Sequence, residues 1–231
     1  MANIHLIGGE KGGVGKSVVA RVLAQYMIDK EIPFVGFDTD QSHGALMRFY
    51  SDFASPMLID SYESLDTMVE LAAENPKERI LVDLAAQTHE QLVKWMDESG
   101  VLEALVDHDL LLVYWHVMDS GKDSVALLKN LFDRFGSRLD YVIVRNQLRG
   151  ENFDLFEKSG EKARADSLDA KIISLKKLNQ QAISRIDSEN SSFWSAQQKS
   201  PANGNGLGIL QRQRVKMWLQ HAYQQIDTVG I

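Results

Sequence analysis

Near the start of the chain stands the segment Lys11-Gly12-Gly13-Val14-Gly15-Lys16-Ser17. An apolar run from Ile4 to Gly8 precedes it, and a helical pattern from Lys16 to Lys30 follows it. Glycines let the backbone take conformations barred to other residues and bring N–H groups close to phosphate oxygens, while the following helix adds the field of its positive end. This order predicts a phosphate-binding P-loop, and a glycine turn that serves packing alone is the weaker interpretation.

Outward from this segment, short apolar runs alternate with helical patterns, which is typical of βαβ units. The sequence therefore predicts an α/β fold with a doubly wound, mostly parallel sheet and helices on both faces. Several strand cores are continuously apolar, as expected for strands covered on both sides. Strands are expected at Ile4 to Gly8, Pro33 to Phe37, Arg79 to Leu84, Leu110 to Trp115, Tyr141 to Arg145 and Lys171 to Leu175. Helices are expected at Lys16 to Lys30, Ser64 to Glu74, Gln87 to Ser99, Lys122 to Arg134 and about Leu207 to Ile226, with Gly100 and Gly136 near helix ends and a loop at Ser200 to Gly208.

The length and composition suit one ordinary domain. With 231 residues, 44% hydrophobic and 25% charged, the chain is expected to form a single P-loop domain over residues 1–231, with the C-terminal helix 207–226 packed on it. The sequence contains no apolar run of spanning length and no signal pattern, so a cytoplasmic protein without a transmembrane segment is expected. It has no cysteine, which excludes disulfides and thiolate metal sites.

The charge of the whole chain bears on its partners. The formal net charge of −7 repels nucleic acid and anionic membranes, so only a local basic patch would bind either.

The P-loop assigns chemistry to particular residues. Lys16 would reach the β- and γ-phosphates, and the Ser17 hydroxyl would ligate Mg²⁺. The nucleotide would also contact the loop and the start of the helix at Gly12, Gly13, Val14, Gly15 and Val18. The dinucleotide fingerprint G-x-G-x-x-G does not fit, because Val18 stands where its last glycine would be, so NAD is not expected.

The second lysine of the segment makes the motif specific. Residue 10 is Glu where the common P-loop has its first glycine, and residue 11 is Lys. The string from Lys11 to Ser17 resembles the deviant Walker A motif of the ParA/MinD family, P-loop NTPases of the SIMIBI type that act as ATP-driven dimeric switches. The resemblance implies ATP and Mg²⁺ as cofactors, and it implies that Lys11 crosses a homodimer interface to touch the partner's nucleotide.

The same resemblance assigns roles to residues at predicted strand ends. Asp38 and Asp40 match the D-x-D of switch I, so Asp38 would support the Mg²⁺ shell and Asp40 would position the attacking water. Asp83 ends a strand that looks like Walker B and would hold a Mg²⁺-bound water, and Asn146 matches the asparagine that reads the adenine edge. Ordinary turn or cap chemistry remains an alternative for Asp38, Asp40 and Asn146.

Two departures from related motifs concern the nucleotide site. Ala86 replaces the glycine of the D-x-x-G seen in many P-loop switches, and Val18 replaces a second hydroxyl near the α-phosphate. Gln87 falls where small GTPases place a water-orienting glutamine, but polarity at the start of a helix is the preferred interpretation.

The carboxyl-terminal third leaves several interpretations open. Val215, Trp218, Leu219, Ala222 and Ile226 form an apolar stripe at helical spacing, and basic residues lie near its start. A helix docked on the sheet is preferred over a basic surface for non-specific DNA, and an interfacial membrane helix is disfavoured by the polar end of the segment.

The leading hypothesis is a slow, partner-stimulated ATPase that dimerises around ATP and positions or partitions a cargo. The cargo would be plasmid DNA or a transfer or polar protein complex, reached through a protein activator or adaptor. Residues Asn3 to Thr39 and the tail Arg212 to Lys216 also look like the TraL-type ATPases encoded with plasmid conjugation functions. Alternatives are a dethiobiotin-synthetase-like ligase and a module that binds ATP without hydrolysis, whereas iron-protein-like metal chemistry is disfavoured by the absence of cysteine.

Overall fold

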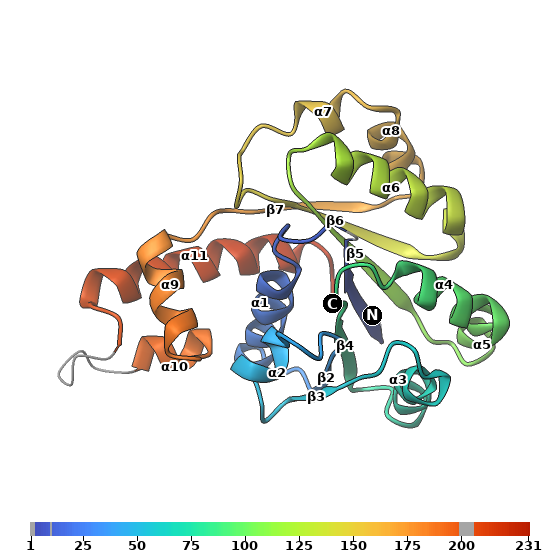
Figure 1. Cartoon of the computed structure of the whole chain (residues 1–231), viewed down its shortest axis with the longest axis horizontal. Coiled ribbons are helices and arrows are strands. Elements are labelled where there is room, and N and C mark those ends of the chain that lie inside the picture. The colour runs from blue at the N-terminus through green and yellow to red at the C-terminus, as the bar shows by residue number, and fades with distance from the viewer. Residues whose placement is uncertain (1–2, 10, 199–205) are drawn as a thin grey trace.

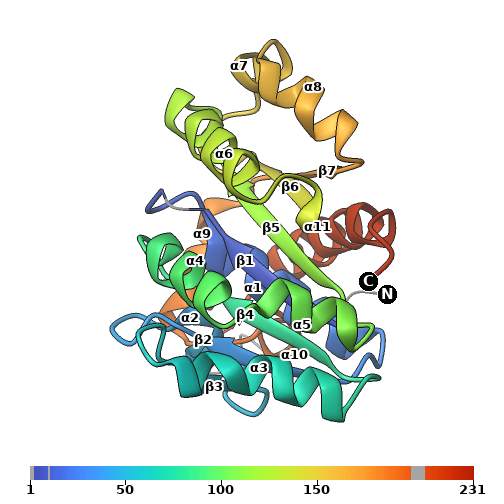
Figure 2. The same cartoon turned by 90° about the vertical axis from the view of Figure 1, so that its right-hand side faces the viewer.

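The computed structural model describes residues 3–9, 11–198 and 206–231 and contains one seven-stranded sheet (Figures 1 and 2). Its strand order is β3-β2-β4-β1-β5-β6-β7, and every pair of neighbouring strands is parallel. The strands are β1 (Ile4–Gly8), β2 (Phe34–Asp38), β3 (Ala54–Pro56), β4 (Arg79–Asp83), β5 (Leu112–Met118), β6 (Asp140–Asn146) and β7 (Lys171–Leu175). Because β1 lies in the middle of this order, the chain runs outward from it in both directions, and the doubly wound α/β fold is confirmed.

Helices cover both faces of the sheet, as Figure 1 shows. One face carries α1 (Lys16–Asp29), α2 (Ala45–Phe49), α9 (Gln180–Ser188), α10 (Phe193–Gln198) and α11 (Ile209–Asp227). The other face carries α3 (Tyr62–Glu74), α4 (His89–Glu98), α5 (Val101–Asp107), α6 (Lys122–Phe135), α7 (Asp154–Glu157) and α8 (Gly160–Ser167), and the 3₁₀ turn η1 (Gly136–Arg138) follows α6. Each face has its own apolar cluster, as the continuously apolar strand cores require.

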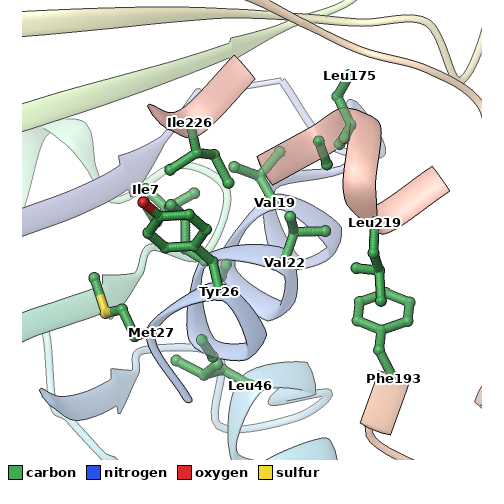
Figure 3. Packing of buried hydrophobic residues seen from close by; sticks show 14 of the residues in the cluster. Ile7, Val19, Val22, Tyr26, Met27, Leu46, Leu175, Phe193, Leu219 and Ile226 are labelled. Carbon is green, nitrogen blue, oxygen red and sulfur yellow. The ribbon is translucent and has the colours of Figure 1, made fainter. Parts of the chain in front are cut away.

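Strand β1 and helix α1 form the centre of the fold. Successive strand side chains point to opposite faces, so Ile4 and Leu6 pack in one cluster while Ile7 packs in the other, each fully buried. Helix α1 is buried over most of its length, and Figure 3 shows its Val19 and Val22 between the sheet and the side chains of α11. The phosphate loop therefore joins a fully buried strand to a helix that is buried over most of its length.

The carboxyl-terminal helix packs on the sheet, as the preferred interpretation of its apolar stripe predicted. Helix α11 contacts β7, α9, α10 and α1. The indole nitrogen of Trp218 donates to the carbonyl oxygen of Lys176 at 2.6 Å, and the hydroxyls of Tyr26 and Tyr223 tie α1 to α11 through Asp227 and Asp29. Within the described part of the chain, no helix combines the length and apolarity needed to cross a bilayer.

The structure extends and corrects the expected elements. Strand β5 ends at Met118 rather than Trp115, and α4 begins at His89 rather than Gln87, because Gln87 has a left-handed backbone (φ 64°) in the preceding turn. Gly100 and Gly136 do lie at helix ends, both with positive φ. The short elements β3, α2, α5, α7, α8, α9 and α10 were not anticipated, and the expected loop at Ser200 to Gly208 falls mostly outside the described residues.

Candidate functional site

The carboxyl ends of β1, β2 and β4 meet in a depression of about 300 Å³. Parallel strands end at the same edge of a sheet, which is where ligands of open α/β folds bind. The depression is lined by Gly12, Gly13, Gly15, Lys16, Ser17, Val18, Asp40, Asp83, Leu84, Ala85 and Ala86. The folded chain thus brings the P-loop and two of the three predicted acidic residues to one place.

Two glycines give the loop its shape. Gly13 and Gly15 have φ of 74° and 93°, in the left-handed region that other residues rarely adopt. Gly15 is also the N-cap of α1, and no side chain caps the N–H groups of that helix end. An uncapped helix N-terminus that opens into a depression offers hydrogen-bond donors and positive potential to an anion.

Lys16 and Ser17, the first two residues of α1, have polar contacts with the loop and with β4. The ammonium of Lys16 lies 3.4 Å from the carbonyl oxygen of Lys11, so the lysine folds back along the loop. Ser17 donates a hydrogen bond to the carboxylate of Asp83. Ser17 therefore bonds the carboxylate of Asp83, and the charge of Lys16 acts on the same carboxylate.

Asp38 and Asp83 form a buried acidic pair. They are register partners on β2 and β4, and their residues are 2% and 3% exposed. Burial, together with the charge of the neighbouring Asp38, raises the pKa of Asp83 to about 7, against the smaller opposing effects of Ser17 and Lys16. Burial also raises the pKa of Asp38, although the N–H groups of Met47 and Asp40 donate to its carboxylate. Two carboxylates held this close, without a cation, disfavour their own ionisation.

One oxygen of Asp83 has no partner. Oδ1 of Asp83 is buried and accepts no hydrogen bond in the described structure. An unsatisfied buried carboxylate oxygen is costly and usually marks a place where water or a metal ion binds.

Thr39 braces the two strand ends. Its hydroxyl donates to the carbonyl oxygen of Asp83 at 3.2 Å and accepts from the N–H of Ala85 at 2.7 Å. Its own N–H donates to the same carbonyl at 3.1 Å. A short side chain thus fixes the segment after Asp38 against the segment after Asp83, a role that the sequence did not reveal.

Asp40 does two things in the structure. Its Oδ1 accepts hydrogen bonds from the N–H groups of Ser42 and His43, which is the turn chemistry weighed as an alternative. Asp40 also lines the depression beside Lys16 and Asp83. The turn holds the carboxylate at the edge of the depression, so the structural role and the predicted positioning role are compatible.

Asn146 is buried against the phosphate loop. Its Nδ2 donates to the carbonyl oxygen of Val14 at 2.8 Å, and its Oδ1 accepts from the N–H of Leu148 at 3.2 Å. These two hydrogen bonds use one donor and one acceptor of the amide. The side chain of Asn146 therefore joins the end of β6 to the phosphate loop.

Lys11 lies beside the loop in an ion-pair cluster that the sequence did not predict. Its ammonium is 3.0 Å from Oδ2 of Asp119 and 3.7 Å from a carboxylate oxygen of Asp123. Arg149 approaches the same Oδ2 at 3.8 Å. Burial works to raise the pKa of Asp119, but hydrogen bonds from Ser124 and Gly121 and the charge of Lys11 outweigh it and lower that pKa.

A detectable signal for Asp119 existed in the sequence. Asp119 directly follows the apolar run of β5, as Asp38 and Asp83 end or follow theirs, but the expected strand stopped four residues earlier. Gln87 is exposed, and its left-handed turn precedes the N-cap Thr88 of α4, in line with the preferred interpretation of helix-start polarity.

Comparisons with known proteins agree with this geometry. No family model matches the sequence. The chain is 26% identical to the Escherichia coli protein TraL over 100% of both chains. It is 27% identical to Acidithiobacillus ferrooxidans protein MobD over 70% of this chain and 71% of that one.

Two solved structures share the fold. A ParA family ATPase from Chlorobium tepidum superposes with a TM-score of 0.53 and 15% identity, covering 96% of this chain and 100% of that chain. The MinD cell division protein of Aquifex aeolicus superposes with a TM-score of 0.51 and 14% identity, covering 95% and 97%. The resemblance drawn from the deviant phosphate loop is confirmed: the chain has the fold of the ParA/MinD ATPases and is similar in sequence to the TraL and MobD proteins.

Proposed function

We propose that the chain is a Mg²⁺-dependent ATPase switch, which binds ATP in the depression, dimerises around it and engages a partner in that state. The observation that carries the proposal is the buried Asp83, whose Oδ1 lacks a partner while Ser17 donates to its carboxylate at the head of an uncapped helix. Such an arrangement suits a Mg²⁺–phosphate group, which supplies both a cation for the carboxylate and an anion for the helix end.

The donors present fit Mg²⁺. Carboxylate and hydroxyl oxygens are its preferred protein ligands, and one or two carboxylates with phosphate oxygens and water are its usual set in nucleotide sites. Ser17 would bind directly, and Asp38 and Asp83 would hold the remaining shell, partly through water. When bound, the ion neutralises charge on the β- and γ-phosphates. Pairing with a cation would also remove the cost of two buried carboxylates that face each other.

The chain's own groups supply the rest of the proposed reaction. The N–H groups from Gly12 to Val18 would cradle the phosphates, and Lys16 would neutralise charge on the β- and γ-oxygens. Asp40 would accept a hydrogen bond from the attacking water, positioned by the turn that fixes its Oδ1. Adenine would meet the amide of Asn146. Positioning and charge stabilisation dominate in phosphoryl transfer, so slow basal hydrolysis is expected until a partner completes the site.

Dimerisation would use Lys11. In the described chain its ammonium lies at the rim of the loop and is held by Asp119 and Asp123. A second subunit that presents its nucleotide to this rim would offer phosphate oxygens to Lys11, which couples ATP to association. In line with the TraL-type resemblance, the ATP-bound dimer would position or partition a cargo such as plasmid DNA or a transfer or polar protein complex, with a protein activator or adaptor.

The test follows nucleotide-dependent association and nucleotide binding. Sedimentation velocity of the full chain should show a dimer with Mg²⁺ and ATP and a monomer with ADP, and Lys11→Ala should remain monomeric with both. Lys16→Ala should lose nucleotide binding, whereas Lys94→Ala, an exposed control on α4, should behave as wild type. A monomer under all conditions, despite saturating ATP, would refute the switch.

Product analysis separates this proposal from a small-molecule ligase. ATP turnover by the switch should release phosphate without an added carboxylic acid. Turnover that depends strictly on such an acid would favour the ligase instead. An Asp40→Ala chain loaded with ATP should retain its partner in a pull-down, because hydrolysis no longer ends the bound state.

A further inference from the structure

Three loops converge at the rim of the phosphate site. They are the phosphate loop, the segment after β5 that begins at Asp119, and the segment after β6 that carries Arg149. A Cβ atom placed on Gly13 would lie 2.6 Å from Nη2 of Arg149, so the guanidinium sits directly over the loop backbone. A Cβ on Gly121 would lie 3.2 Å from the ammonium of Lys11. Arg149 is thus held against the phosphate loop, and Lys11 of that loop is held against the segment after β5; both cations approach Asp119.

The two oxygens of Asp119 have different surroundings. Oδ1 accepts from the hydroxyl of Ser124 at 2.7 Å and from the N–H of Gly121 at 3.0 Å, which fixes the carboxylate. Oδ2 lies 3.0 Å from the ammonium of Lys11, which also reaches Oδ1 at 3.4 Å, and 3.8 Å from the guanidinium of Arg149. A fixed anion with one oxygen between an ammonium and a guanidinium resembles the position of a phosphate oxygen between two basic side chains.

Arg149 is only weakly held by this anion. At 3.8 Å the pair is beyond hydrogen-bond distance, and the arginine side chain is 52% exposed. An ion pair of this length and exposure stabilises a folded chain little. A guanidinium presents five N–H donors in a planar fork that matches phosphate geometry, and this one already lies over the phosphate loop.

We propose that Arg149 binds a phosphate of the nucleotide held by its own subunit, and that Asp119 is the counterion that keeps Arg149 and Lys11 beside the loop until phosphate replaces it. The inference deepens the proposed function and depends on it. It predicts opposite changes in nucleotide affinity for substitutions of Asp119 and Arg149. Asp119 competes with phosphate for the cations, whereas Arg149 attracts phosphate. A purely structural ion pair would instead make both substitutions act in the same direction.

The experiment measures nucleotide affinity in the Lys11→Ala background, where association between subunits is removed. Fluorescent ATP and ADP analogues are titrated with Mg²⁺ into the full chain carrying Arg149→Gln, Arg149→Lys or Asp119→Asn. Arg149→Gln is also titrated with Lys11 present, and wild type and Lys16→Ala are titrated for reference. Arg214→Gln, an exposed arginine of α11, is the control for the loss of one positive charge. Thermal unfolding of each variant without nucleotide reports whether it is folded.

Arg149→Gln is expected to raise Kd about tenfold, the usual effect of losing one charge-assisted hydrogen bond, and Arg149→Lys should restore part of the loss. Asp119→Asn should lower Kd a few-fold, and Arg214→Gln should change it by less than twofold. If Asp119→Asn does not fold, the comparison of the two Arg149 variants with Arg214→Gln carries the decision.

Several results would overturn the inference. An unchanged Kd in Arg149→Gln, with intact binding by its parent, would refute it and leave the proposed function standing. A loss of affinity that appears only when Lys11 is present would place the contact across the dimer and refute a contact within one subunit. If wild type, like Lys16→Ala, shows no saturable nucleotide binding, the proposed function and this inference are refuted together.

Discussion

Asp38 and Asp83 stand opposite each other at the carboxyl ends of the neighbouring strands β2 and β4. Both are buried, and Oδ1 of Asp83 has no hydrogen-bond partner among the described residues. Without a cation, ionisation of this pair lowers the stability of the folded chain, since each carboxylate disfavours ionisation of the other. Functional sites often contain such a cost, which ligand binding then relieves.

The pH dependence of stability should report this pair. The folded pKa of Asp83, about 7, is above its ordinary value of 3.8, so the folded chain holds more protons between these values. The contribution of Asp83 is therefore fully present below about pH 4 and is lost as pH rises through 7. At pH 8 without Mg²⁺, Asp83→Asn should raise the free energy of unfolding by about 2–4 kcal/mol, and by less at pH 5.

Urea unfolding between pH 5 and 8.5 measures this difference, and Asp60→Asn serves as an exposed control. Mg²⁺ with ATP should stabilise wild type but not Asp83→Asn. A gain that is the same at every pH would contradict the assigned pKa.

Two glycines of the phosphate loop should differ sharply in tolerance. A Cβ on Gly15 would lie 2.2 Å from Nδ2 of Asn146, and Gly15 has a φ of 93°. A Cβ on Gly12 would meet nothing within 4 Å. Gly15→Ala should cost about 2–4 kcal/mol through left-handed strain and the clash, whereas Gly12→Ala should stay within about 0.5 kcal/mol. Thermal or urea unfolding without nucleotide measures the stabilities of the two variants. Equal stabilities of Gly15→Ala and Gly12→Ala would show that the loop has another conformation.

Asn146 should stabilise the chain before any nucleotide binds. Asn146→Ala removes the donor that pairs with the buried carbonyl of Val14, and should lower the free energy of unfolding by about 1–3 kcal/mol. Asn146→Asp keeps the size but loses the donor, so it should be destabilising as well. Asn130→Ala, on the exposed side of α6, is the control. A nucleotide-free stability that does not change would confine Asn146 to contacts with the base.

Two tryptophans of the carboxyl-terminal third provide a matched test of how α11 is held. Trp218 is 8% exposed and donates to the carbonyl oxygen of Lys176, while Trp194 is 56% exposed. Trp218→Ala should cost about 3–5 kcal/mol, since it removes a large buried side chain. Trp194→Ala should cost less than about 1 kcal/mol. Chemical unfolding followed by circular dichroism measures both, and similar losses would mean that α11 is not docked through Trp218.

Much of the fold was readable from local pattern. The core strands are runs of apolar residues, and the long helices have apolar stripes, so contiguous residues carry their own signal. The phosphate loop is also local, because glycines, lysine, hydroxyl and helix start follow one another within a single turn. Strand β3 and the short helices were missed for the complementary reason: a three-residue edge strand or a helix of one or two turns has no periodicity of its own and forms only because the core holds it.

The sequence by itself determined the phosphate loop, the doubly wound sheet and the strand ends at which Asp38 and Asp83 lie. Tertiary structure alone decided which distant side chains meet there. It placed Asn146 under Val14 across 132 residues, and it brought Asp119 and Arg149 to Lys11. The physical reason is that strand order, not chain order, sets neighbours at the edge of a parallel sheet. The charges and burial that shift a pKa or hold a cation come from those neighbours.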